Sequence, residues 1–330
     1  AIAAAVAAPL TAQAAVNLSG DAEFAMQKFE AGSGGWAGTN EVRVKVDADL
    51  GGGVGVHTRM RMEIGDTHAM TTQAIGMNNQ VTTDYAYLTA MAGPAKLTMG
   101  DQLANWGTKV WIEGATKRNR LVATFNPSSA LTAKIIMDPY YDPTASNDGK
   151  PRLSLAAVYK MSNMMSAGVL LLGKMDPQLT DAGGTNAAAD AQNNVFVKGQ
   201  MSGIVFGVES FEFGGASRAN YVMAGMKAGG ANLELHYLDG KTADADWSPV
   251  GVINGDANLA GSAVDTIVIT AGMKAGGMDI TAGIGQAAAT SGGDKESLVG
   301  LDLGKKMGAA DFNFSYGSYN SASSYGFSFK

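Results

Sequence analysis

The sequence contains no cysteine, which excludes disulfide scaffolds, thiolate metal sites and cysteine catalysis. Proline is scarce at 8 residues, and charged residues make up only 16% of the chain. No stretch beyond the first residues approaches the roughly 20 uninterrupted apolar residues that a transmembrane helix needs. The net charge of −6 argues against a nucleic-acid partner, because nucleic-acid-binding proteins usually carry a basic face. Any membrane crossing must therefore use strands.

Glycine is abundant, with 44 residues, and the hydropathy of the chain alternates with a period of two. In residues 41–50, Val42 and Val44 alternate with Arg43 and Lys45, and the same alternation continues along the segment. One face of such a strand is apolar and the other is charged, as a strand between lipid and water requires.

Short turns rich in glycine alternate along the chain with longer polar connections. The longer connections are 30–40, 65–80, 102–119, 140–150, 177–194 and 240–261. The strands number about eighteen, or about sixteen if one weak hairpin is false. We therefore expect an all-β fold, a closed antiparallel transmembrane β-barrel with short periplasmic turns and long extracellular loops. The strands of a soluble β-sandwich also alternate apolar and polar residues. However, the single hydrophobic core of a sandwich cannot pack so many similar hairpins.

Three hairpins in the last third repeat one design. Their turns read Lys-Ala-Gly-Gly at 227–230 and 274–277, and Lys-Lys-Met-Gly at 305–308. Such turns between alternating segments are typical of β-hairpins.

The first residues differ from the rest, because they form an apolar run that ends in Ala12, Gln13 and Ala14. This run has the character of the h-region and cleavage site of a secretory signal. We expect residues 1–14 to be a signal-peptide remnant and residues 15–330 to form a single barrel domain. An alanine-rich helix or a flexible N-terminus is the alternative.

Two segments carry a resemblance to a known family. Residues 324–329 read Ser-Tyr-Gly-Phe-Ser-Phe, and residues 97–102 read Leu-Thr-Met-Gly-Asp-Gln just before a long connection. These two segments, together with the succession of hairpins with short turns over nearly all of 15–330, make the sequence similar to the trimeric general porins of Gram-negative bacteria. That family normally stops on the final aromatic residue, whereas Lys330 follows it here.

The resemblance implies a homotrimer in the outer membrane, in contact with lipid and lipopolysaccharide. It also implies a water-filled channel for passive diffusion of ions and small hydrophilic solutes. The family's third long loop folds inward and narrows the pore, which makes 103–117 the candidate constriction loop. The residues implied for the constriction are Asp101, Trp106, Lys109, Trp111 and Glu113.

Basic residues concentrate on the strand face expected to line the lumen: Arg43, Lys45, Arg59, Arg61, Arg118, Arg120 and Lys134. Fixed charge at a narrow point attracts counter-ions, so this set predicts a preference for anions. The carboxylates Asp47, Asp49, Glu63, Asp84 and Asp138 would partly neutralise it. A solvated charged face with weak cross-strand pairs is the alternative for any single residue.

Aromatic residues are expected on outward faces, as membrane-interface girdles: Tyr85, Tyr87, Tyr159, Tyr221, Tyr237, Phe312, Phe314, Tyr316, Phe327 and Phe329. Their alternative role is ordinary cross-strand packing.

Catalysis is not expected. The histidines His57, His68 and His236 are far apart in the sequence, and no HExxH, GxSxG or P-loop pattern occurs. No cofactor is expected either. Six carboxylates on the long connections have the chemistry of calcium ligands, although exposure to solvent explains them equally well: Asp142, Asp148, Asp181, Asp190, Asp244 and Asp246.

Two other functions remain open. One is a solute-selective barrel of about eighteen strands, and the other is a plugged structural or adhesive outer-membrane barrel.

Overall fold

A computed structural model describes residues 15–29, 36–63, 80–102, 105–106, 112–113, 118–138, 152–173, 192–213, 217–241, 264–288, 294–319 and 322–330. Within these ranges the regular structure consists of β-strands, and no helix there is long and apolar enough to cross a membrane. The signal-like segment 1–14, Lys109, Trp111 and the six loop carboxylates lie outside the described residues.

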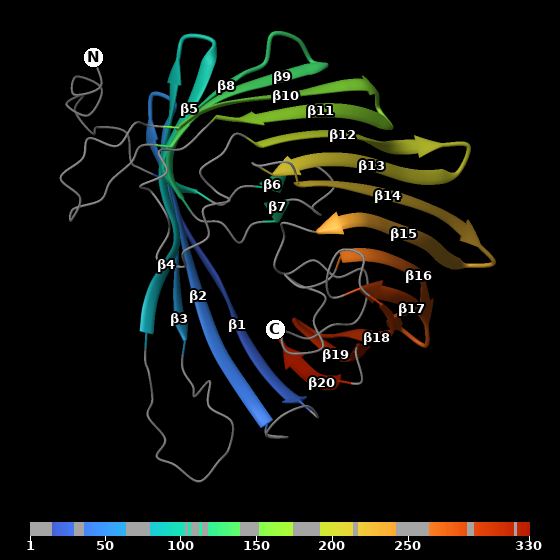
Figure 1. Cartoon of the computed structure of the whole chain (residues 1–330). Coiled ribbons are helices and arrows are strands. Elements are labelled where there is room, and N and C mark those ends of the chain that lie inside the picture. The colour runs from blue at the N-terminus through green and yellow to red at the C-terminus, as the bar shows by residue number, and fades with distance from the viewer. Residues whose placement is uncertain are drawn as a thin grey trace, which may run out of the picture.

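The strands follow one another along the chain as the period-two pattern predicted (Figure 1). The first half contains β1 (Ala15–Phe29), β2 (Trp36–Gly51), β3 (Val54–Glu63), β4 (Gln80–Ala92), β5 (Ala95–Gln102), β6 (Asn105–Trp106), β7 (Ile112–Glu113), β8 (Arg118–Phe125), β9 (Leu131–Asp138) and β10 (Arg152–Ser162). The second half contains β11 (Met165–Leu172), β12 (Gln192–Met201), β13 (Ile204–Phe213), β14 (Ser217–Ala228), β15 (Ala231–Lys241), β16 (Val264–Ala275), β17 (Met278–Ala288), β18 (Lys295–Met307), β19 (Ala310–Tyr319) and β20 (Ala322–Phe329).

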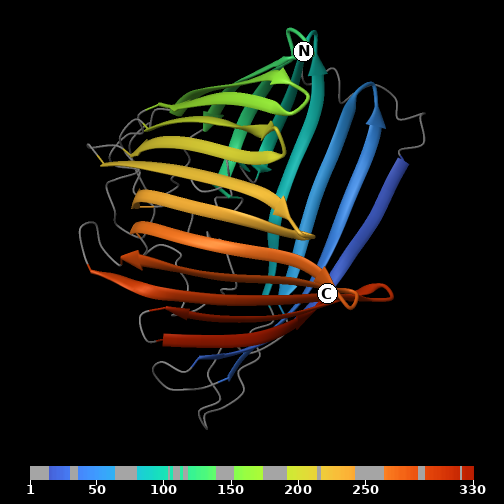
Figure 2. The same ribbon diagram turned by 90° about the vertical axis from the view of Figure 1, so that its right-hand side faces the viewer.

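Eighteen of the strands form one closed antiparallel sheet. Each strand of this sheet pairs with its neighbour in the chain, β5 pairs with β8, and β1 pairs with β20 to close the ring. Figure 2 shows the broad wall that runs from β10 to β19. The predicted fold class is confirmed, with the upper of the two expected strand numbers. Closure leaves no exposed sheet edge, because every strand in the ring has two partners.

The short turns lie where the glycine-rich segments predicted them. Gly229 and Gly230 have φ angles of 57° and 87°, and Gly276 and Gly277 have φ angles of 58° and 74°. Two consecutive residues with positive φ are the signature of the two-residue turns that match the twist of a hairpin. These positions require glycine because other residues enter this region at a cost.

The outside of the barrel is apolar. Large side chains at alternate positions of the strands are exposed there, among them Val44 on β2, Leu155 on β10, Val208 on β13 and Ile269 on β16. The positions between them point inward. The apolar phase of the alternation therefore covers the outer surface, and the other phase faces the interior of the ring.

Candidate channel interior

The inner wall formed by β1 to β4 is strongly charged. The strand register places Asp21, Arg43 and Arg61 in one cross-strand row. The next row toward the short turns contains Lys45 and Arg59. All of these positions alternate with exposed apolar residues such as Val44, so the structure places the predicted basic residues of β2 and β3 inside the ring.

Each of these cations on β2 pairs with a carboxylate. Arg43 bonds to Glu41, and its Nη1 lies 3.5 Å from Asp21 Oδ2. Lys45 Nζ lies 2.7 Å from Asp47 Oδ2. Because the partners are only partly exposed and lie on the same or the adjacent strand, the ion pairs offset the positive charge locally.

The cations of β3 share one carboxylate. A register shift between Arg59 and Met60 gives β4 one extra residue, and Asp84 occupies that position. Arg59 Nε lies 2.7 Å and Arg61 Nε 3.3 Å from the Asp84 carboxylate. A β-bulge can redirect a side chain in this way, and here it brings a carboxylate between two arginines. The paired charges on this wall remove the basis for the predicted anion preference at this point.

His57 is held by three contacts on the same wall. Its Nδ1 lies 2.7 Å from Asp47 Oδ1, its Nε2 lies 3.3 Å from the Thr89 hydroxyl, and its ring stacks on Tyr87 with centroids 4.8 Å apart. The order of these groups resembles an acid–base–hydroxyl relay. However, the described backbone around Thr89 is paired with β3 and β5, so no N–H groups converge there to stabilise an oxyanion. The contacts therefore fix the imidazole against the wall.

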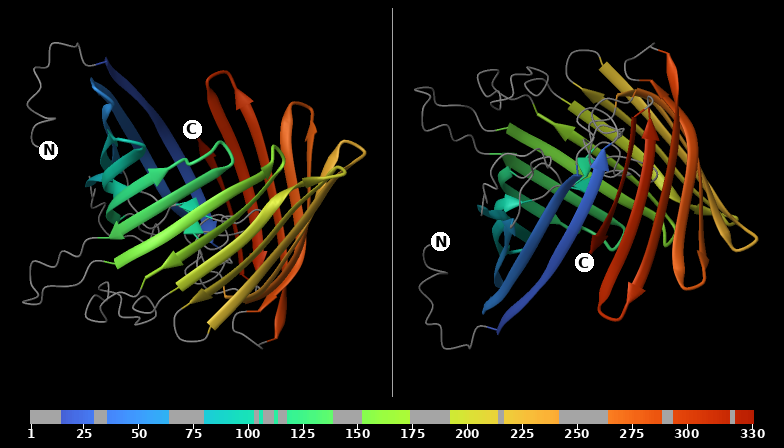
Figure 3. Two further views of the ribbon diagram at one scale, coloured as in Figure 1. Left: turned by 90° about the horizontal axis from the view of Figure 1, so that it is seen from above. Right: turned by 90° about the horizontal axis from the view of Figure 1, so that it is seen from below.

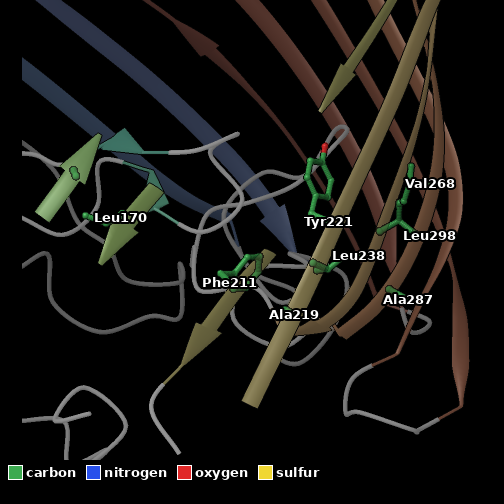
Figure 4. Packing of buried hydrophobic residues seen from close by; sticks show 9 residues of the cluster. Leu170, Phe211, Ala219, Tyr221, Leu238, Val268, Ala287 and Leu298 are labelled. Carbon is green, nitrogen blue, oxygen red and sulfur yellow. The ribbon is translucent and has the colours of Figure 1, made fainter. Parts of the chain in front are cut away.

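The opposite wall, from β10 to β18, is different, because many of its inward side chains are apolar and buried. They are Ala156, Leu170, Phe196, Phe211, Ala219, Tyr221, Leu238, Val268, Ala287 and Leu298. Figure 4 shows most of this inner apolar cluster on the strands that carry it. An inward side chain in an open water-filled lumen would be exposed, whereas Phe211 is only 1% exposed. These inner side chains are therefore shielded from solvent.

Two pairs of polar side chains within the buried wall are hydrogen-bonded to each other. Asn194 Nδ2 donates a hydrogen bond of 2.6 Å to Glu209 Oε1, and both side chains are buried. Tyr221 and His236 share a hydrogen bond of 2.8 Å between the phenol oxygen and Nδ1. Such pairing offsets the cost of removing polar groups from water.

The third long connection begins after β5, and its described part is the β6–β7 hairpin. Asn105 pairs with Glu113 and Trp106 with Ile112. This hairpin lies inside the ring of strands in Figure 1 and in both views of Figure 3. The described part of the predicted third loop thus lies inside the ring. The side chains of Trp106, Glu113 and Arg118 lie outside the described part of the structure.

The remaining predicted site residues have different environments. Arg120 is buried on the inner wall, and its Nε lies 3.1 Å from Asp138 Oδ1. Lys134 is half-buried and also faces inward, since it alternates with the exposed Ile135. Asp101 is in register with Ala86 and Asn119, which belong to the outward phase, so its expected place on the inner wall is wrong.

Three of the aromatic residues expected on the outside face inward instead. Tyr221 belongs to the buried inner cluster, and Tyr87 stacks on His57 of the inner wall. Tyr85 lies under Arg59, with the guanidinium carbon 5.1 Å from the ring centroid. In contrast, Tyr159, Tyr237, Phe327 and Phe329 are exposed on the outer surface as predicted.

Comparison with solved structures identifies the fold. OpdL of Pseudomonas aeruginosa superposes with a TM-score of 0.62 at 12% identity, covering 96% of this chain and 97% of that one. A BenF-like porin of Pseudomonas fluorescens Pf-5 gives a TM-score of 0.62 at 10% identity, covering 96% and 98%. The chain has the fold of outer-membrane porins.

A third porin structure, OccK8 (OprE) of Pseudomonas aeruginosa, gives a TM-score of 0.66 at 11% identity and covers 96% of this chain and 97% of its own. No protein-family model matches the sequence. No curated protein matches it either. At these identities the likeness establishes the porin fold alone. Within the described residues, no group of three or more histidine, cysteine, aspartate or glutamate side chains could hold a metal ion.

Proposed function

We propose that the chain is a bacterial outer-membrane porin that forms a water-filled channel for passive diffusion of ions and small hydrophilic solutes. The observation that carries this proposal is the division of the closed barrel between an apolar outer surface and a charged, partly exposed inner wall on β1 to β4. A bilayer on the outside and water on the inside satisfy both faces. On this view the chain is a channel and not an enzyme, and it needs no cofactor.

The water path in this proposal is off-centre. Inner side chains on β2 and β3 keep contact with solvent: Lys45 is 44% exposed and Arg61 is 37% exposed. The inner side chains Phe211 on β13 and Leu238 on β15 are buried, at 1% and 0% exposure. Solutes would therefore move along the paired charges of β1 to β4, opposite the buried apolar side chains.

A solute-selective eighteen-stranded porin is supported equally well. OpdK of Pseudomonas aeruginosa, whose structure contains vanillate, superposes with a TM-score of 0.61 at 12% identity over 96% of this chain and 97% of that one. The buried apolar side chains on one side of the interior also suit a narrow, selective path. Homotrimer formation and contact with lipopolysaccharide, which the general-porin resemblance implies, remain predictions.

Planar-bilayer recording of the detergent-purified chain tests the channel directly. We expect discrete, ohmic openings in KCl. Ser19→Trp on the inner face of β1 should reduce the unitary current, because Ser19 is in register with Lys45 on the water path. Leu18→Trp is the matched control, because Leu18 points outward and is 68% exposed. The absence of openings would favour a plugged structural or adhesive barrel instead.

A further inference from the structure

The outer surface of β12 to β15, part of the wall in Figure 2, changes from apolar to polar toward the long connections. Asn193 on β12 is opposite Glu212 on β13, and Glu212 is opposite Arg218 on β14. These residues belong to the outward phase, because they alternate with the buried Asn194 and Phe211. A cross-strand row of polar side chains therefore lies on the outside of the barrel.

A second polar row lies two residues further from the long connections. Ser210 on β13 is opposite Asn220 on β14, and Asn220 is opposite Asp239 on β15. All three are exposed. The next outward residues, Val208 and Val222, are exposed and apolar. We call the residues of the two rows the outer polar patch: Asn193, Ser210, Glu212, Arg218, Asn220 and Asp239.

The outer polar patch is confined to part of the barrel. Leu171 on β11, which is opposite Asn193, is 48% exposed, and Leu153 at the start of β10 is 58% exposed. These two strands keep apolar side chains on the outer surface up to the long connections. A polar border common to all strands would include them, so the patch is a local feature of β12 to β15.

An apolar groove lies on the same outer surface, nearer the short turns. Its volume is about 300 Å³, and most of its lining comes from the outward phase of β13 to β16. The small Ala224 lies among Met226, Leu235 and Ile269, which are 52%, 42% and 54% exposed. A hydrocarbon chain can occupy such a groove without leaving a polar group unpaired.

The distance between the patch and the groove matches the depth of one lipid leaflet. Arg218 and Ala224 are six residues apart on β14, which corresponds to about 20 Å of strand. At a strand tilt of about 40°, this is about 15 Å of depth, half the hydrocarbon core of a bilayer. Arginine on a lipid-facing strand is costly at the midplane and tolerated at the interface. Arg218 at the interface therefore places the groove near the midplane, where acyl chains end.

Arg218 provides the positive charge of the outer polar patch. Its side chain is 72% exposed, and its Nη2 lies 3.8 Å from Glu212 Oε2, beyond hydrogen-bond distance. The Glu212 carboxylate instead accepts a hydrogen bond of 2.8 Å from Asn193 Nδ2. The planar guanidinium can thus direct two parallel N–H groups to a phosphate, the geometry that arginine favours.

The row of Ser210, Asn220 and Asp239 suits hydroxyl groups. A sugar hydroxyl both donates and accepts hydrogen bonds, and this row offers a hydroxyl, an amide and a carboxylate on adjacent strands. A ligand with phosphate alone would find no partner for the Asp239 carboxylate. A head group that combines phosphate with sugar hydroxyls matches both rows.

We propose that the outer surface of β13 to β16 binds one molecule of a phosphorylated glycolipid. Its phosphate contacts Arg218, its sugar hydroxyls contact the row of Ser210, Asn220 and Asp239, and one acyl chain follows β14 and ends in the groove at Ala224. The site needs the outer-membrane position of the barrel but no conduction. Failure of this site and failure of the channel are therefore separate results.

Native mass spectrometry of the detergent-purified full chain, titrated with lipid A, tests the site. We expect the wild type to retain one lipid A molecule in preference to phosphatidylglycerol. Arg218→Gln removes the phosphate contact, and Ala224→Trp fills the groove. Each should weaken lipid A binding about tenfold. Resistance of the barrel to heat-induced unfolding in SDS verifies that each variant is folded.

Each variant has a matched control on the outer surface. Lys305→Gln removes one outward cation near a short turn, opposite Phe312, and Ala157→Trp adds an outward tryptophan on β10. We expect both controls to change the affinity for lipid A less than about twofold, since they lie outside the site. Equal retention of lipid A and phosphatidylglycerol by the wild type, or no retention of lipid A, would overturn the proposal. Weakening by either variant no greater than by its control would also overturn it.

Discussion

Phe211→Ala is expected to lower the free energy of unfolding by about 3–5 kcal/mol, the range typical for deleting a fully buried phenylalanine. Phe211 is 1% exposed and belongs to the inner apolar cluster on β13. Its removal leaves a space that the rigid strands on either side cannot close. Guanidinium unfolding in detergent micelles, followed by tryptophan fluorescence, measures the loss.

Phe206→Ala provides a control on the same strand. Phe206 is in register with the outward Ala224, so it lies on the outer surface of the barrel. Acyl chains or detergent can occupy the space left by its side chain, and we expect a clearly smaller loss than for Phe211→Ala. Equal losses would mean that the two phases of β13 are not divided between a packed interior and a lipid-facing surface.

Val44→Arg is expected to destabilise the barrel in a bilayer by about 2–4 kcal/mol, the cost of arginine on a lipid-facing strand near the bilayer midplane. Val44 lies in the middle of β2 and is 40% exposed on the outer surface. The neighbouring Lys45→Arg keeps a cation on the inner wall beside Asp47 and should change the stability little. The free energy of unfolding from lipid vesicles is measured for both variants. Equal values would contradict the assignment of Val44 to the outer surface and Lys45 to the inner wall.

The architecture could be predicted from the sequence because it follows from local chemistry. Alternation in 41–50 fixes which residues share a face, and paired glycines such as Gly229 and Gly230 fix where the chain reverses. In an up-and-down barrel each strand pairs with its neighbours in the chain. Turns and alternation therefore determine almost the whole topology, and only the β1–β20 closure joins distant parts.

The division of the interior could not be predicted in the same way. A period of two shows which residues share a face of a strand. It identifies the face in contact with water only when one of the two sets of residues is polar. Residues 169–172 of β11 read Val-Leu-Leu-Leu, so both phases are apolar there. Leu170 faces inward and is buried, while Leu171 is exposed outside. Apolar residues in both phases were the available signal that part of the inner wall is shielded from water.

Local irregularity explains the other differences. Asp84 reaches both Arg59 and Arg61 only because a bulge adds a residue to β4, and no sequence pattern specifies a bulge there. The aromatic girdle prediction was wrong for Tyr85 and Tyr87, since it placed both on the lipid side. A tyrosine with a polar partner can equally line the interior, as Tyr87 does beside His57.

Cysteine labelling tests the central claim most directly, because the native chain has no cysteine to interfere. Single substitutions Val42→Cys, Arg43→Cys, Val44→Cys and Lys45→Cys are reconstituted in lipid vesicles and treated with a membrane-impermeant maleimide. We predict strict alternation, with labelling at positions 43 and 45 and protection at 42 and 44. Uniform labelling, or labelling at 42 and 44 with protection at 43 and 45, would contradict a barrel with lipid outside and a wet, charged wall inside.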